Sequence, residues 1–212
     1  MTVRLFTYIL RQDGGFAPNP FWGYCTLACC KPVIRRTAEV GDLIIGIAPK
    51  QRGHRLAYAM EVAEIITFAD YWRDPRFRVK RPRWRSPTIL ERCGDNCYEP
   101  VSGGEFHQLP SAHSNSDGSE NVGSKQRDLS GKRVLVATRF WYLGGDAVAL
   151  PQKLSFGIVG RGHRRQFTPE QVKAFRTFLS GLPAGVQGPP AKWKVGDRSY
   201  LQATGEPRQR HC

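Results

Sequence analysis

Cysteines are the residues of this 212-residue chain best suited to covalent chemistry, and three of the six stand at positions 25, 29 and 30. A thiol becomes a nucleophile when a neighbouring base or positive charge stabilises its thiolate. If the protein is an enzyme, we expect Cys25 or Cys29 to attack the substrate, with His113 or Asp95 as the acid–base partner brought close by the fold. The same residue types also occur as buried thiols and in polar turns, so a structural role stays open for each.

A zinc site is the second chemistry that the cysteines allow. Cys25 with Cys29, and Cys93 with Cys97, form two pairs with three residues between the thiols. Four thiolates hold zinc in a tetrahedral arrangement. Both pairs lack the compact spacing of a zinc knuckle, and small thiols are common in protein cores. We therefore predict neither a metal site nor a cofactor.

The sequence lacks the common signatures of nucleotide chemistry. No glycine-rich loop ends in Gly-Lys-Ser or Gly-Lys-Thr, and residues 157–162 do not have the spacing of a dinucleotide-binding fingerprint. The zinc-deaminase pattern of His-x-Glu with Cys-x-x-Cys is also missing. Any reaction on a base would therefore depend on another arrangement of residues.

Aromatic residues, thiols and prolines are concentrated between residues 15 and 32. A rigid loop of this kind suits base stacking, which contributes about 1–3 kcal/mol per base. The alternative is that the aromatic side chains cover the end of a β-barrel. We predict stacking by Trp22, Tyr24 or Trp84, contacts with base edges by Asn19, Thr26, Asp95 or Asn96, and contacts with the phosphates of the nucleotide by Lys31, Arg35 and Arg36.

The net charge of +14 indicates a polyanionic partner. Residues 73–92 contain eight basic and two acidic residues, with Trp84 among them. Basic residues interleaved with aromatic ones are typical of a nucleic-acid-binding surface, where cations contact phosphates and rings contact bases. We predict that Arg81 and Arg83 bind phosphate and that the partner is nucleic acid.

Strand patterns dominate the chain. Residues 3–10, 43–48, 55–66 and 133–140 are rich in apolar and β-branched residues and are bounded by turn residues, which predicts strands. Residues 25–40 are expected to carry either a short helix or an extended loop, and residues 67–72 a short helix capped by Thr67. Residues 167–179 form the clearest helix, with Thr168 as cap and Pro169 in the first turn. The polar segment 111–131 is expected to be a long loop.

Composition predicts a protein that does not enter a membrane. Apolar residues make up 40% of the chain, and its apolar runs are strand-sized, whereas a membrane span needs roughly 20 apolar residues. The first residues lack the pattern of a secretory signal, so we expect a cytoplasmic protein with reduced thiols. We assign one domain to residues 1–182 and a basic tail rich in glycine and proline to residues 183–212.

Several uncommon strings resemble the nucleotide modification associated domain 2 family of bacterial and phage DNA base modification systems. The matching strings lie at residues 16–20, 23–32, 35–46, 58–62, 71–77, 94–96, 133–136 and 142–145. A wider similarity, carried by residues 40–45 and 59–62, is to PUA-like domains of the EVE and ASCH type. This resemblance implies an α+β, mainly β fold, namely a PUA-like β-barrel with flanking helices. It also implies that the ligand is a modified nucleotide, but it does not imply any particular reaction.

Three hypotheses follow for the function. The first is a binding module that holds a modified, flipped nucleotide of DNA in an aromatic pocket. The second is an enzyme that installs, remodels or removes a DNA base modification with a cysteine nucleophile. The third is a basic scaffold that joins partner proteins of a modification or defence system.

Overall fold

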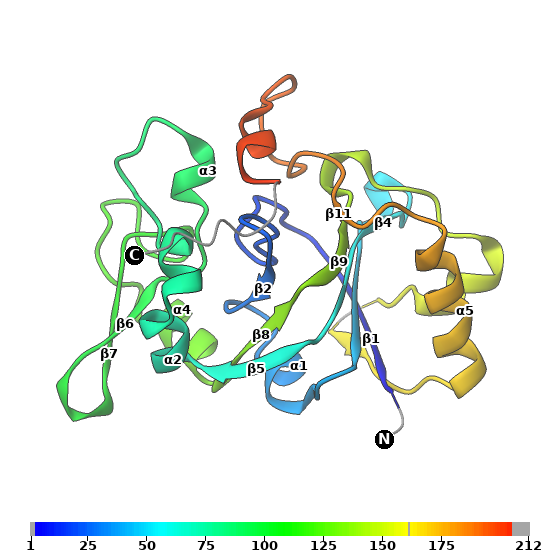
Figure 1. The fold of residues 1–212 in the computed structure, drawn as a ribbon, viewed down its shortest axis with the longest axis horizontal. Coiled ribbons are helices and arrows are strands. Elements are labelled where there is room, and N and C mark those ends of the chain that lie inside the picture. Colours follow the sequence, from blue (N-terminus) through cyan, green and yellow to red (C-terminus); the bar gives the residue numbers. More distant parts are fainter. Residues whose placement is uncertain (1–2, 161, 205–212) are drawn as a thin grey trace.

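A computed structural model of the chain describes residues 3–160 and 162–204. The fold is α+β and consists mostly of β-structure, with helices placed around two sheets (Figure 1). The predicted fold class is therefore confirmed at this level.

The larger sheet has six strands in the order β10-β1-β3-β4-β9-β11. β3 pairs in parallel with β1 and antiparallel with β4, which places it in the middle of the sheet. All of its residues are buried, as the continuous apolar run predicts for a central strand. The six strands are β1 (Leu5–Ile9), β3 (Leu43–Ile47), β4 (Leu56–Glu61), β9 (Arg139–Tyr142), β10 (His163–Arg164) and β11 (Gly185–Val186).

The smaller sheet has three strands in the order β2-β8-β5, and it is joined to the larger sheet by a bent ribbon. β5 follows β4 after two residues, and β8 precedes β9 with one residue between them. Ala63 lies in the bend and donates its backbone N–H to Val136 O (2.8 Å). The strand predicted over 55–66 is therefore broken into two. The strands of this sheet are β2 (Cys25–Leu27), β5 (Glu64–Thr67) and β8 (Arg133–Ala137).

The sheets do not close into the predicted barrel within the described residues. β10 and β11 are the two edges of the larger sheet, and each pairs with one neighbour. Both edge strands are only two residues long, which is too short for a ladder that would join the edges. The observed architecture is thus an open sheet that bends into a second one.

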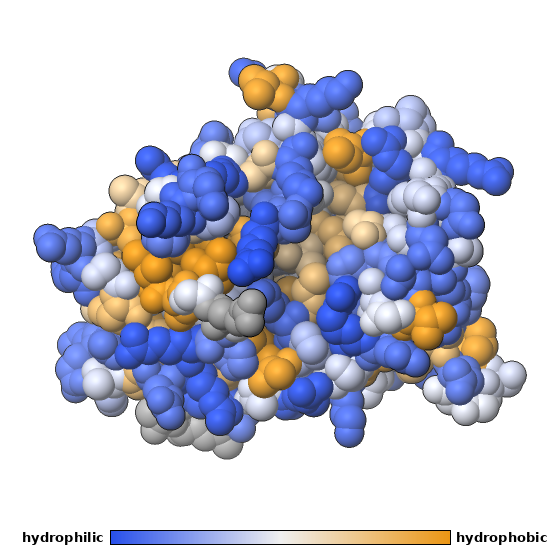
Figure 2. Space-filling model, turned by 180° about the vertical axis from the view of Figure 1, so that it is seen from behind, coloured by the Kyte–Doolittle hydropathy of each residue, from blue (hydrophilic) through white to orange (hydrophobic). Residues whose placement is uncertain are grey.

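Helix α5 (Pro169–Ser180) covers one face of the larger sheet (Figure 1). Its apolar side chains Val172 and Phe175 pack with Leu5 and Ile45 of the sheet. Thr168 accepts a hydrogen bond from the Gln171 backbone N–H, and the Gln171 side chain accepts one from Thr168 N. This capping box confirms the predicted helix and its start. Figure 2, from the opposite side, shows hydrophobic side chains gathered on the half that carries α5 and a hollow near the middle of the face.

Short helices and one hairpin surround the smaller sheet. Thr67 caps α2 through its hydroxyl, which accepts from Asp70 N, as the sequence predicts. The α-helices here are α1 (Pro32–Thr37), α2 (Phe68–Arg73), α3 (Ile89–Arg92) and α4 (Val122–Leu129), and the hairpin is β6 (Tyr98–Pro100) with β7 (Phe106–Gln108). The 3-10 helices are η1 (Lys50–Arg52), η2 (Pro75–Lys80), η3 (Ser102–Gly104), η4 (Gly144–Asp146), η5 (Gln152–Gly157) and η6 (Ser199–Ala203).

Helix α4 corrects the prediction of an uninterrupted loop over 111–131. Its sequence is polar and includes Gly123, so it carries no apolar stripe that would reveal it. The helix is stabilised instead by Asn121, whose side chain accepts from Ser124 N, and by hydrogen bonds of the buried Asp128 in its last turn. Polar contacts with the rest of the protein thus replace the usual apolar face.

Residues 183–204, which belong to the predicted tail, pack on the body of the protein. β11 pairs with β9, and the buried Trp193 stacks on Phe21 with 5.6 Å between ring centres. Trp22 donates its backbone N–H to Ala203 O. The rest of that predicted tail, 205–212, lies outside the described residues. Among the described residues, no helix has both the length and the apolar character needed to cross a membrane.

Candidate active site

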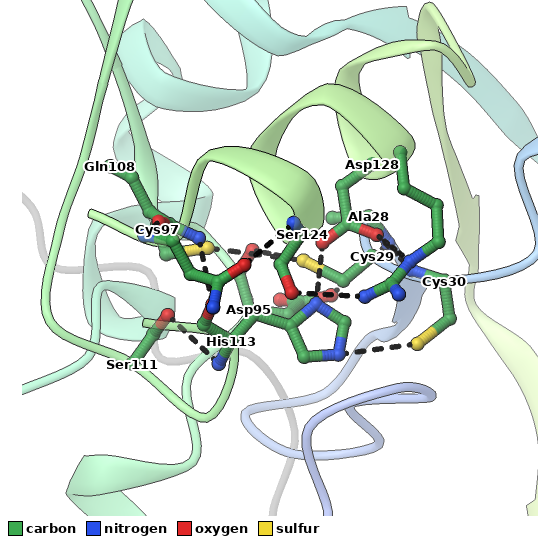
Figure 3. A network of polar contacts seen from close by, with 12 residues as sticks. Ala28, Cys29, Cys30, Asp95, Cys97, Gln108, Ser111, His113, Ser124 and Asp128 are labelled. Carbon is green, nitrogen blue, oxygen red and sulfur yellow. Dashed lines mark hydrogen bonds and ion pairs between the residues drawn. The ribbon is translucent and has the colours of Figure 1, made fainter. Parts of the chain in front are cut away.

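A thiol, an imidazole and a carboxylate form a hydrogen-bonded chain next to the smaller sheet (Figure 3). Cys30 Sγ lies 3.4 Å from His113 Nε2, and His113 Nδ1 lies 2.6 Å from Asp128 Oδ2. Cys30 comes from the turn between β2 and α1, His113 from the loop after β7, and Asp128 from the last turn of α4. Three segments far apart in sequence therefore meet at one thiol.

The turn that presents Cys30 has an uncommon backbone. Cys30 and Lys31 both have positive φ angles, 58° and 43°. Such values are unfavourable for residues with side chains and persist only where the surroundings hold them. Here Cys30 donates its N–H to Asp128 Oδ1 (2.8 Å), so the carboxylate that contacts His113 also fixes the backbone of the thiol. Strand, strained turn and helix together resemble the turns that expose catalytic nucleophiles.

Asp128 is fully buried, and several donors hold its carboxylate. Besides the contacts with Cys30 and His113, Oδ2 accepts a hydrogen bond from the Tyr98 hydroxyl (2.8 Å). Burial alone would raise the pKa of Asp128, but the hydrogen bond and charge of His113, with the bonds from Cys30 N and Tyr98, lower it below its usual value. The group is therefore a carboxylate at neutral pH.

His113 lies between the thiol and this carboxylate, and its side chain is 16% exposed. Burial lowers the pKa of His113, but hydrogen bonds with Asp128 and Cys30, and their charges, raise it to about 10. The imidazole also contacts the Phe16 ring edge to face, with 4.8 Å between ring centres. Gln108 donates to His113 O (3.2 Å), which holds the loop in place. His113 is therefore positioned as an imidazolium that can donate to the sulfur.

The arrangement has the parts needed for covalent thiol catalysis. A buried carboxylate orients the imidazole, and the imidazole contacts a thiol that is partly accessible. A protonated imidazole beside sulfur favours the thiolate, which is the nucleophilic form, and later supplies a proton to the leaving group. The sequence predicts His113 as a site residue but does not single out Cys30 or Asp128. The adjacent cysteines at positions 29 and 30 are the signal in the sequence that could point to the thiol.

The fully buried Arg35 holds the Cys30 turn, the end of α4 and the start of β8 together through hydrogen bonds. Its guanidinium donates to Cys30 O and Arg133 O, both at 2.8 Å, and to Asp128 O. Gly131 lies against this group, because a Cβ at that position would be 2.3 Å from the guanidinium. All of these acceptors are backbone carbonyls of the protein, so Arg35 acts in the fold rather than at the surface.

Two other predicted phosphate-binding residues are accessible. Lys31 is half-buried, and its Nζ lies 4.2 Å from the centre of the Tyr8 ring. Burial lowers its pKa, although the adjacent Cys30 acts in the opposite direction. Arg36 is exposed and donates to Ser130 O (2.7 Å). Lys31 is thus the predicted cation that the structure keeps beside the thiol.

Cys25 and Cys29 lie in the core, and neither is the thiol that contacts Nε2 of His113. Both are fully buried, and burial raises the pKa of each thiol. Cys29 Sγ lies 3.8 Å from Cys97 Sγ, while Cys93 contacts Leu90 O through its thiol. The partner of His113 in the described structure is therefore Cys30.

Asp95 is at the centre of a second buried network. It accepts hydrogen bonds from Thr26 Oγ1 (2.8 Å) and the Tyr71 hydroxyl (2.6 Å). Burial raises its pKa, against the effects of Lys80 and these donors. Gly94, the residue before it, packs against the chain, since a Cβ there would lie 2.2 Å from Lys80 O.

The predicted base-reading amides are used inside the protein. Asn96 Nδ2 donates to Tyr71 O and Phe77 O, and Asn19 Nδ2 donates to Gly15 O and Cys93 O. Both side chains are buried. Together with Thr26 and Asp95, they satisfy buried polar groups of the core in the described structure.

Trp22 and Tyr24 are half-buried, and each ring lies under a cation. Lys80 Nζ is 5.6 Å from the Trp22 ring, and the Arg76 guanidinium is 5.7 Å from the Tyr24 ring. Lys80 is fully buried, which lowers its pKa to about 8, and it donates to Asn19 and to Tyr24 O. These rings are therefore packed parts of the fold.

Trp84 and Arg83 lie instead at a surface groove of about 560 Å³. Trp84 is 39% exposed, and Arg83 forms an ion pair with Glu91 (2.8 Å). Arg81 is directed elsewhere, because its guanidinium stacks on Trp72 at 3.7 Å and donates to Trp72 O. Of the predicted stacking residues, Trp84 thus lines this groove.

Among residues 3–160 and 162–204, one group of ligating atoms is close enough together for a metal ion. Sulfur of Cys29, a nitrogen of His113 and a carboxylate oxygen of Asp128 lie within 4.8 Å of one another. Both oxygens of Asp128 already accept hydrogen bonds, and both nitrogens of His113 have partners. These contacts fit a carboxylate that orients an imidazole better than they fit a set of metal ligands.

Comparison with known proteins agrees with the resemblance found in the sequence. A model of the family described as nucleotide modification associated domain 2 matches residues 2–197. The comparisons with curated proteins and with solved structures found no match.

We predict that His113 titrates near pH 10 in the folded protein, measured by NMR of the labelled imidazole. Asp128→Asn removes the main partner that raises this pKa and should move the titration down by more than one pH unit. Asp117→Asn, an exposed change, serves as the control. A wild-type midpoint near the ordinary value of 6.5 would contradict the assigned network.

The same shift makes stability depend on pH. Because folding raises the pKa of His113, its contribution to the free energy of unfolding is fully present below about pH 6.5 and is lost as the pH rises through about 10. Denaturant unfolding of wild type and His113→Gln across this range measures the difference. A difference that grows with pH would rule the interpretation out.

Gly94→Ala should destabilise the protein by about 1–3 kcal/mol, because the new methyl group would meet a backbone carbonyl that cannot move cheaply. Gly14→Ala is the matched control, since nothing lies within 4 Å of a Cβ there. Urea unfolding of both variants gives the comparison. Equal midpoints would show that the Gly94 packing is not as described.

Proposed function

Because the chain belongs to the nucleotide modification associated domain 2 family, we propose that it is an enzyme of a nucleotide modification system that uses Cys30 as a covalent nucleophile. The observation that carries this proposal is the hydrogen-bonded chain from Cys30 through His113 to the buried Asp128. Nucleic acid or its nucleotides supply the substrate, in keeping with the family and the charge of +14.

The reaction class is transfer of a group at an electrophilic, unsaturated carbon of a base or its substituent. The Cys30 thiolate forms a sulfur–carbon bond, and the bond between that carbon and the leaving group breaks. The leaving group takes the electron pair and receives the proton of His113. Water or an amine then attacks the same carbon, gives its proton to His113, and releases Cys30 as thiolate. The modification is thereby removed or replaced.

The neighbouring residues have defined parts in this proposal. Asp128 keeps Nδ1 of the imidazole occupied, so that Nε2 faces the sulfur. Lys31, next to the nucleophile in sequence, binds a phosphate of the nucleotide. Cys25, Cys29 and Asp95 are buried and support the fold.

A module that only reads a modified base has less support as the whole function. Trp22 and Tyr24 are packed under cations, and Asn19, Thr26 and Asn96 satisfy groups of the core. An aromatic pocket built from them would require these contacts to open. Base recognition is accordingly proposed as substrate binding by an enzyme.

Turnover by the full chain tests the proposal. Protein is incubated with DNA or nucleotides that carry plain or modified bases, with and without an amine acceptor. The masses of the resulting nucleosides are then measured by mass spectrometry. Cys30→Ala should abolish the mass change, and His113→Gln should slow it about 100-fold or more. Cys93→Ala, which removes a buried thiol outside the chain of contacts, is the control. Full turnover by Cys30→Ala would refute the proposed nucleophile.

A further inference from the structure

A groove of about 560 Å³ separates residues 82–87 from the loop that carries His113. Trp84 lines one side and is 39% exposed. Pro110 and Gly118 line the other side, and a Cβ at Gly118 would lie 3.8 Å from Trp84 Nε1. The volume is within the range of sites that hold a nucleotide-sized ligand.

The side chains at this groove fit an unpaired nucleotide. Trp84 offers a flat aromatic surface, and Arg83 and Arg85 beside it are exposed cations. Arg83 is partly neutralised by Glu91, whereas no ion pair of Arg85 occurs among the described residues. The segment 73–92 around them has eight basic and two acidic residues, which favours a ligand with several negative charges.

An acidic residue at the opposite wall adds a contact suited to a base. Asp117 lines the groove, and its Oδ1 accepts hydrogen bonds from Ser119 N (2.9 Å) and Ser119 Oγ (2.6 Å). These bonds fix the carboxylate in place. A carboxylate would repel phosphate but accepts hydrogen bonds from the amino groups of bases. The wall near Asp117 therefore suits a base edge, and the arginine side suits phosphate.

The groove and the candidate active site share one well-ordered loop. Ser114 donates its backbone N–H to Ser111 O, and Gly118 donates to Asn115 O, so the loop is built from two tight turns. His113 lies in the first turn, and Gly118 closes the second at the groove. One wall of the groove and the imidazole therefore belong to the same loop.

We propose that this groove binds a single-stranded stretch of nucleic acid, with one base stacked on Trp84 and the adjoining phosphates on Arg83 and Arg85. The bound strand presents a neighbouring nucleotide to Cys30. Binding at the groove stands by itself, whereas delivery to Cys30 rests on the proposed function.

Fluorescence anisotropy of a labelled single-stranded 12-mer, at fixed salt, tests the binding step. Trp84→Ala should weaken binding about tenfold or more, because stacking on the ring is lost. Trp84→Phe should restore most of the affinity. An affinity of Trp84→Ala equal to that of wild type would overturn the proposal, as would duplex binding as tight as single-strand binding and indifferent to Trp84.

The salt dependence of binding distinguishes binding in the groove from attraction by the net charge of the protein. Arg85→Gln should reduce the slope of log affinity against log salt by about one. Arg139→Gln, an exposed arginine lining a separate depression with Arg176 and Glu61, is the charge-matched control and should leave the slope near the wild-type value. If the two substitutions change the slope equally, the nucleic acid is attracted by net charge alone, and the proposal that it binds in the groove is wrong.

The two proposals fail separately. Cys30→Ala should bind the 12-mer with wild-type affinity while losing turnover. If Trp84→Ala loses binding and Cys30→Ala keeps full turnover, the groove stands and the nucleophile is wrong. If Trp84→Ala binds normally but Cys30→Ala is inactive, the nucleophile stands and the groove is wrong.

Discussion

A carboxylate without access to water has to be satisfied by the protein, and Asp128 meets this requirement with donors from three other segments. The N–H of Cys30, the hydroxyl of Tyr98 and the imidazole of His113 each bond to it. Loss of any one donor would leave a buried charge only partly compensated, which is strongly unfavourable. The turn of the thiol, the hairpin and the loop of the imidazole are therefore held together by one group.

The same constraint explains features that look unrelated in the sequence. Arg35 is buried because its guanidinium ties the carbonyls of Cys30 and Asp128, and Gly131 leaves the space for it. The positive φ of Cys30 is tolerated because its N–H is bonded to Asp128. The hydrogen bond from Cys30 N thus stabilises both the strained backbone of Cys30 and the buried charge of Asp128. It leaves the Cys30 thiol partly accessible beside His113.

Sequence patterns predicted the elements that an apolar face or a cap stabilises, such as β3 and the helix that Thr168 caps. They could not predict α4, because that helix depends on polar contacts made by Asp128 across the fold. The sequence also could not show that Cys30, and not Cys29, contacts His113, because this depends on the side-chain direction at a left-handed turn. The sequence predicts base recognition by Asn96, because sequence alone does not distinguish an amide that bonds a ligand from one that bonds buried carbonyls, as Asn96 does.

The most direct test of the proposed nucleophile is the rate at which iodoacetamide alkylates each thiol of the native protein, measured by mass spectrometry of the peptides. We expect Cys30 to react first among the five cysteines of the described structure, with Asp128→Asn removing that advantage, because the imidazolium beside the sulfur then loses the carboxylate that supports it. If Cys30 reacts no faster than it does in Asp128→Asn, or if Cys25, Cys29, Cys93 or Cys97 reacts before it, the proposal of Cys30 as the catalytic thiol is contradicted.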